Sequence, residues 1–292
     1  MTTTTRPPTG ERTATRKRTL RRRLSALPTH LILIIAAALT GYPLFVMAST
    51  AFKSNAEVYQ NPVGFPQQPT IDNFVLSWHA ANFPNLFLNS TIFTVTSMVL
   101  AILVSSLAAY GLVRVTSRIS SFAYLGLSAG IFLPLQLAII PQFQLMVHLG
   151  LVDSYLGVIL IYAAGSTPFG VFLIASFMQA IPREFGEAAA IDGAGFFQTY
   201  WRIYLPMARP AIGSFIVLQG VGIWNDYLVP LLLLSDPTKR TLTTGILLFK
   251  QQYVADWGNI MAGVLIMTIP IIIVFVFAQR YFVSGLFSGG VK

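Results

Sequence analysis

The chain has 292 residues, of which 54% are hydrophobic and only 10% are charged. Soluble globular domains carry about a quarter of their residues as charged side chains, so this composition excludes an ordinary soluble fold and predicts a membrane protein. The absence of cysteine excludes a disulfide framework and a thiolate metal site.

The chain begins with a basic tail, residues 1–29, which includes the run RTATRKRTLRRR and much of the net charge of +9. A basic tail before an apolar run usually sets membrane topology or contacts anionic lipid. We therefore expect a disordered cytoplasmic tail and no nucleic-acid partner.

The first apolar run, residues 31–52, is longer than the core of a signal peptide and follows a long polar leader. It is interpreted as a retained anchor, with a first transmembrane helix over residues 30–52. A helix needs about 20 apolar residues to cross the hydrocarbon core, which predicts an all-α membrane protein of about six transmembrane helices. The six apolar stretches are residues 31–52, 89–113, 122–147, 155–177, 210–234 and 260–282.

The distribution of basic residues predicts the orientation of these spans. With the N-terminus in the cytoplasm, only four of the 19 Lys and Arg residues fall in outer segments: Lys53, Lys239, Arg240 and Lys250. Because positive residues gather on the cytoplasmic side, both termini, including a tail at 281–292, are predicted to be cytoplasmic. The expected location is the cytoplasmic membrane, with a long extracytoplasmic loop at 53–84.

The inner loop, residues 179–209, contains the stretch EAAAIDGAGFFQTYWRIYLP. Its composition predicts a short Ala-rich helix, a turn at Asp192 and Gly193, and a second short helix that stops near Pro206. In the second helix the three- and four-residue spacing predicts one aromatic face. That face, made by Phe197, Tyr200, Trp201 and Tyr204, has two possible partners: the ends of the chain's own membrane helices, or a groove on another protein.

This stretch resembles the Glu-Ala-Ala loop of ABC importer permeases. The matching positions are Glu187, Ala188, Ala189, Asp192, Gly193, Ala194, Tyr200, Ile203, Leu205 and Pro206, with Tyr200 where Phe is usual. The segments LPLQLAIIPQF, LGLVDSYLG, WNDYLVPL and QRYFVSGLFSGGVK resemble the maltose-type, carbohydrate-importing branch of that family.

The resemblance implies a type-1 permease domain over residues 85–280, whose inner loop forms coupling helices that seat in a cytoplasmic ATPase. It implies as partners a second permease subunit in a heterodimer, two ATP-binding-cassette ATPase subunits and an extracytoplasmic solute-binding protein. ATP and Mg²⁺ would be bound by the ATPase, with no cofactor in this chain. Gly193 would then supply a positive φ at the corner between the two helices.

The chain lacks the G-x-x-x-x-G-K-[ST] motif that cradles phosphate in P-loop ATPases, and it shows no Ser/His/Asp or Cys/His constellation. Its three histidines, His30, His79 and His148, are too scattered for a recognisable metal site. We therefore expect neither an enzyme nor a metalloprotein.

Asp226 is the one acid well inside a predicted span, and an ionisable residue at membrane depth is a functional candidate. With Trp224, Asn225 and Tyr227 it could line a substrate path, the indole stacking on a sugar ring and the polar groups binding hydroxyls. An interfacial acid that braces the outer end of its helix is an equal alternative.

Two functions are therefore weighed. The first is the permease subunit of an ATP-driven importer for a carbohydrate, which covers sugars, oligosaccharides and polyol derivatives. The alternative is an ion- or proton-coupled secondary carrier for a small polar solute, but such a carrier would carry several ionisable residues in mid-span.

Overall fold

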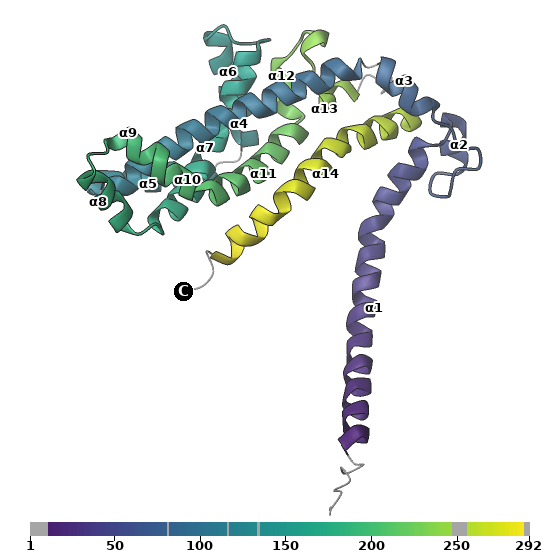
Figure 1. Cartoon of the computed structure of the whole chain (residues 1–292). Helices are drawn as coiled ribbons and strands as arrows, with labels where there is room; N and C mark the ends of the chain where they lie inside the picture. Colours follow the sequence, from purple (N-terminus) through teal and green to yellow (C-terminus); the bar gives the residue numbers. More distant parts are fainter. Residues whose placement is uncertain (1–10, 81, 116, 133–134, 247–255, 289–292) are drawn as a thin grey trace, which may run out of the picture.

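The computed structural model describes residues 11–80, 82–115, 117–132, 135–246 and 256–288, and these residues form helices and connecting loops without a strand (Figure 1). The predicted all-α class is confirmed. The longer helices are α1 (Glu11–Ala51), α3 (Asp72–Ala80), α4 (Phe83–Arg114), α5 (Arg118–Ala129), α6 (Ile139–His148), α7 (Tyr155–Gln179), α8 (Arg183–Ile191), α11 (Arg209–Asn225) and α14 (Trp257–Ser288). The shorter ones are α2 (Asn55–Gln60), η1 (Gly130–Phe132), η2 (Leu135–Ala138), α9 (Phe196–Thr199), η3 (Tyr200–Tyr204), α10 (Leu205–Met207), α12 (Leu228–Leu233), η4 (Pro237–Lys239) and α13 (Leu242–Gly245).

Helices α4, α7, α11 and α14 form the packed body of the molecule, and α4 and α7 lie along each other (Figure 1). Small residues permit their close approach, as is usual between membrane helices. A Cβ atom added at Gly170 of α7 would lie 2.4 Å from Ser105 Oγ of α4 and 2.7 Å from a ring atom of Phe215 of α11. Glycine is therefore required where the three helices meet.

Helix α1 leaves this body and contacts α14 only near the C-terminal end of α1 (Figure 1). Its segment Pro28–Ala51 is long and apolar enough to cross a membrane, yet none of the most hydrophobic part is buried. The helix begins at Glu11, so the expectation of a wholly disordered tail is wrong for residues 11–29. The apolar surface of α1 is thus left for lipid or another subunit to cover.

Two of the six predicted spans are interrupted. Among the described residues, three helices have the length and composition of a membrane span, namely Pro28–Ala51, Phe83–Arg114 and Tyr155–Gln179, with a shorter apolar segment at Trp257–Ile273. Within residues 122–147, α5 ends at its C-cap Gly130, and α6 starts anew with Pro141 in its first turn. Proline is tolerated there because first-turn N–H groups need no helical partner.

The predicted span 210–234 is interrupted at Asp226, which is extended (φ −68°, ψ 135°) between α11 and α12. Its carboxylate accepts the backbone N–H groups of Leu228 and Val229, both at 3.2 Å. These are first-turn donors of α12, which would otherwise lack partners. The acid therefore ends one helix and starts the next.

Candidate functional site

The segment with the Glu-Ala-Ala pattern joins α7 to α11 and projects from one end of the bundle as α8, α9, η3 and α10, far from α3 (Figure 1). We call residues 183–207 the coupling segment. The short helix, turn and second helix expected here are present. The second helix ends with α10 at Met207, one residue after Pro206, and α11 begins at Arg209, so the predicted stop near Pro206 is confirmed.

The corner of the coupling segment is a Schellman motif. The N–H of Ala194 donates to the carbonyl of Ala189 (2.8 Å), and the N–H of Gly193 donates to that of Ala190 (3.1 Å). Such a helix end needs a left-handed residue, and Gly193 has φ +77°. The predicted positive φ at Gly193 is confirmed, and it fixes the direction in which the second helix leaves.

Grooves lie along both faces of α8. The first, of about 670 Å³, separates α8 from α9 and η3, and its floor contains the small side chains of the motif. The lining residues that belong to the motif are Ala188, Ala189, Asp192, Ala194 and Ile203. The second groove, of about 640 Å³, separates α8 from the ends of α4, α5 and α7, and is lined by Glu187 together with Arg114 and Arg183.

Large apolar side chains at the tip of the coupling segment are exposed. The exposed fractions are 87% for Ile191, 66% for Phe197 and 53% for Trp201. Charged residues adjoin them in the sequence, Asp192 after Ile191 and Arg202 after Trp201, and both are exposed. An apolar surface mixed with charges is typical of a protein interface, since these charges would be costly in hydrocarbon.

The predicted aromatic face is divided between two surroundings. Tyr200 and Tyr204 are buried, at 0% and 6% exposed, whereas Phe197 and Trp201 point outwards. The Tyr200 hydroxyl lies 2.7 Å from Ser106 Oγ of α4. Packing against the chain's own helices therefore holds for Tyr200 and Tyr204, whereas docking of the exposed Phe197 and Trp201 on another protein stays a prediction. The remaining motif residues Leu205 and Pro206 are half-buried beside α11.

Element η3 is a π-helix over Tyr200–Tyr204, and the N–H of Leu205 donates to the carbonyl of Tyr200. π-Helical turns are rare in proteins, and those that do occur are often found at functional sites. The ring of Tyr110 of α4 lies against Tyr200 and Tyr204, at centroid distances of 5.4 and 5.0 Å. Ser106 and Tyr110 were not predicted, because nothing in the apolar pattern of α4 distinguishes them from lipid-facing or core residues.

The four residues proposed for a substrate path do not converge on one site. Trp224 lies edge-on against Phe87 of α4, and its Nε1–H donates to the Met267 carbonyl of α14 at 3.4 Å. Asp226 points the other way, to the hydroxyl of Tyr162 in α7 at 2.9 Å. Asn225 and Tyr227 are exposed. The contacts of Asp226 favour a capping role for that acid.

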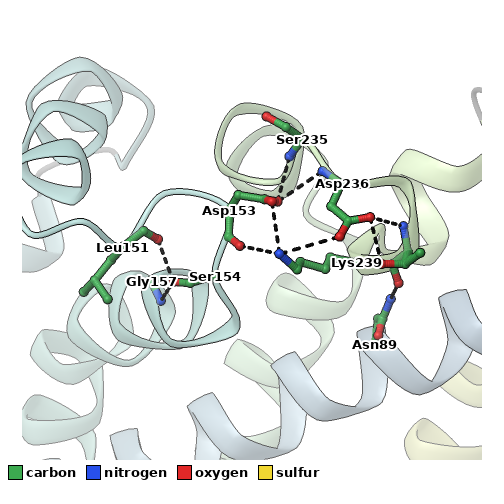
Figure 2. Close-up of polar contacts among 9 residues, drawn as sticks. Asn89, Leu151, Asp153, Ser154, Gly157, Ser235, Asp236 and Lys239 are labelled. Carbon is green, nitrogen blue, oxygen red and sulfur yellow. Dashed lines mark hydrogen bonds and ion pairs between the residues drawn. The ribbon is translucent and has the colours of Figure 1, made fainter.

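A polar network lies at the opposite end of the bundle, around the turn before α7 (Figure 2). Asp153, at φ +56°, accepts the N–H groups of Ser235 and Asp236 on one carboxylate oxygen, both at 3.1 Å. Lys239 Nζ lies 3.0 Å from the other oxygen and 3.7 Å from the carboxylate of Asp236. We call Asp153, Ser235, Asp236 and Lys239 the outer network.

These contacts shift the protonation equilibria of the outer network. The backbone N–H of Asp236 and the ammonium of Lys239 lower the pKa of Asp153. Bonds from the N–H and hydroxyl of Thr238 lower the pKa of Asp236. The hydrogen bond to Asp153 raises the pKa of Lys239. All three groups are therefore held in their charged forms. In the part of the chain that the structure describes, no cluster of three or more metal-ligating side chains is found.

A bundle of apolar helices with a projecting helical segment at one end defines the class of a helical membrane protein. The family model of the "binding-protein-dependent transport system inner membrane component" matches residues 86–288. The chain belongs to that family, and it is a membrane protein of an ABC transport system.

Named relatives agree with this assignment. The chain is 34% identical to the probable ABC transporter permease protein YurM of Bacillus subtilis, over 86% of this chain and 83% of that protein. It is 32% identical to the diacetylchitobiose uptake system permease protein NgcG of Streptomyces coelicolor, over 92% and 89% of the two chains. One solved structure, a bacterial ABC transporter for import of the acidic polysaccharide alginate, has the same fold with a TM-score of 0.79. That match has 24% identity and covers 89% of this chain and 97% of the other.

Proposed function

We propose that this chain is a permease subunit of an importer for a carbohydrate, and that the coupling segment docks a separate ATPase. The single observation that carries the docking role is the exposed apolar tip held beyond the Schellman corner. Family membership supplies the transport role, and the diacetylchitobiose and alginate transporters named above support a saccharide as the solute.

The orientation supports the same proposal. The positive-inside distribution favours a coupling segment in the cytoplasm, where ATP is available, and an outer network on the other side, where a solute-binding protein would deliver the solute. A second permease subunit would complete the pathway, and the uncovered apolar surface of α1 favours such a neighbour. ATP-driven closure of the ATPases would then shift the helices between two packings of similar free energy.

The carrier alternative receives less support. Each carboxylate oxygen of Asp226 already accepts a backbone N–H, and one also accepts the hydroxyl of Tyr162. These three bonds give Asp226 a structural role, as the cap of α12 and the partner of Tyr162. Uptake that survives ATP depletion and collapses with the proton gradient would nevertheless favour a carrier.

The docking role is tested by placing a charge on the exposed tip. Ile191→Asp is expected to reduce the ATPase that co-purifies with the permease by at least about tenfold, because a central apolar contact of an interface contributes about 2 kcal/mol. Val63→Asp is the matched control, since Val63 is also exposed, at 52%, but lies at the outer end. Equal co-purification for wild type, Ile191→Asp and Val63→Asp would contradict docking at the tip.

A further inference from the structure

The inner end of α4 holds the coupling segment through a buried hydrogen bond. Ser106 and Tyr200 are both 0% exposed, and their side-chain oxygens lie 2.7 Å apart. The Ser106 hydroxyl also lies 2.5 Å from the carbonyl of Ile102, to which it donates its one proton. Tyr200 must then be the donor to Ser106. Loss of the Ser106 hydroxyl therefore removes the acceptor of the Tyr200 hydroxyl, and loss of the Tyr200 hydroxyl leaves Ser106 bonded only within α4.

An aromatic cluster strengthens this attachment one turn further along α4. The ring of Tyr110, fully buried, contacts the rings of Phe196, Tyr200 and Tyr204, the first at a centroid distance of 4.6 Å. Its hydroxyl donates to the carbonyl of Phe196 at 3.3 Å. Both the α9 and the η3 part of the coupling segment are thus fixed to α4.

The N-terminal end of α4, which is the predicted outer end, holds residues 234–242 in the same way. We call these residues the outer loop. The amide nitrogen of Asn89 donates to the carbonyls of Thr238 and Arg240, at 2.8 and 2.9 Å (Figure 2 shows the first). Ser90 Oγ accepts the N–H of Leu242 at 2.9 Å. Asn89 and Ser90 are buried, at 1% and 3% exposed. The residues that follow the outer network are therefore attached to α4 directly.

No other described helix makes buried polar contacts of this kind with both segments. Helix α4 is continuous between its two attachments, and Asn89 and Ser106 are separated by about 25 Å at 1.5 Å per residue. Helix α11 follows the coupling segment in the chain, but it ends at Asn225, where Asp226 interrupts it. Helix α4 therefore connects the two segments without a break, whereas α11 does not.

We propose that α4 is the rigid element by which the coupling segment and the outer loop, residues 234–242, sense each other's position. This inference rests on the proposed function, because it assumes that an ATPase moves the coupling segment. Ser106, Tyr200 and Asn89 are then positioning residues. Since coupling between two sites is reciprocal, an event at the outer loop also changes the affinity of the ATPase for nucleotide.

The absence of native cysteine allows a single reporter to test the inference. Ser235→Cys places an exposed thiol in the outer loop of an otherwise cysteine-free chain. The permease would be purified with its associated ATPase in lipid nanodiscs, and maleimide labelling rates compared without nucleotide and after trapping with ATP and vanadate. We expect the two rates to differ. In the Ser106→Ala background that difference should shrink about fivefold, the effect of removing one buried hydrogen bond.

Matched variants separate transmission from general damage. Ser176→Ala removes an exposed helix serine and should leave the rate difference unchanged. Tyr200→Phe, Ser106→Ala and the double variant should lose about the same amount, because each removes the one hydrogen bond that joins these two side chains. Asn89→Ala, or the milder Ser90→Ala, should give a similar loss from the other end, with the same amount of ATPase bound.

The outcomes distinguish this inference from the proposed function. If no ATPase co-purifies with the unmodified chain, the proposed function fails, and the inference fails with it. If ATPase is bound and the reporter responds equally in wild type, Ser106→Ala and Asn89→Ala, the role of α4 alone is overturned. Additive losses for Ser106→Ala and Tyr200→Phe would also overturn it, since the two side chains would then act separately.

Discussion

Gly193 is the residue of the coupling segment that adopts a left-handed backbone conformation. Two glycines flank the corner, and a Cβ atom added at either Gly193 or Gly195 would meet no atom within 4 Å. They differ in backbone conformation, because Gly193 has φ +77° and Gly195 has φ −71°. A methyl side chain therefore fits at both positions, and the two glycines differ only in the left-handed backbone conformation of Gly193.

We predict that Gly193→Ala weakens association with the ATPase and Gly195→Ala does not. A non-glycine residue in the left-handed region costs about 1–2 kcal/mol, so the corner would open in part of the population. The expected result is a loss of about fivefold to thirtyfold in the apparent affinity for the ATPase, measured by titration of the purified subunits. Equal affinities of the two variants would show that the corner geometry is not required.

At the residue scale, the sequence predicted positions that a local rule governs. The glycine corner follows from the requirement for positive φ, and the motif residues follow from their spacing. Ser106 and Asn89 could not be predicted in the same way, because their partners lie 94 and 149 residues away. Among apolar neighbours, a lone serine or asparagine indicates only some polar contact.

The outer network is the best-defined polar element, and it joins the turn before α7 to the residues after α12. The pairing of Asp153 with Lys239 is a tertiary contact between residues 86 positions apart, so no local pattern in the sequence predicts it. Because both carboxylates have a lowered pKa, their contribution is present above an ordinary carboxyl pKa of about 4 and is lost as the pH falls through the lowered values. Lys239 has a raised pKa, so its contribution is present below about 10 and is lost as the pH rises through the raised value.

We therefore predict that the network stabilises the outer end between about pH 4 and pH 10, and that this contribution is lost further into acid and further into base. Thermal unfolding of the purified chain in detergent would be followed across this range. Lys239→Met should lower the unfolding temperature within the window and make its dependence on pH less steep. Asp72→Asn, a carboxylate change outside the network, is the control. A Lys239→Met profile parallel to wild type would refute a stabilising role.

Element boundaries were predictable where composition alone decides them and not where one side chain does. The uninterrupted spans in α4 and α7 follow from apolar length. The break within 210–234 depends on the carboxylate of Asp226, which caps α12. A single acid changes the mean hydropathy of the segment very little, so hydropathy does not predict the break. The spacing of the aromatic face was predicted correctly, but two of its residues pack against α4 and the other two are exposed. Helical periodicity alone cannot show which residues pack and which are exposed.

At the scale of the whole molecule, polar contacts are concentrated at the two ends of an apolar bundle. The coupling segment and its charges lie at one end, and the outer network lies at the other (Figure 1). The charges at both ends are costly to move through hydrocarbon, so the bundle has one stable orientation once it is inserted. The positive-inside distribution selects which end faces the cytoplasm.

This orientation is predicted to be measurable with single cysteines in the cysteine-free chain. Val63→Cys in the predicted extracytoplasmic loop at 53–84 and Gln198→Cys in the coupling segment both introduce an exposed thiol. In intact cells stripped of any outer envelope, a membrane-impermeant maleimide should label Val63→Cys and should label Gln198→Cys only after permeabilisation. Labelling of both after permeabilisation controls for expression and reactivity. The reverse pattern would place the coupling segment outside, away from ATP, and no cytoplasmic ATPase could then drive this bundle through it.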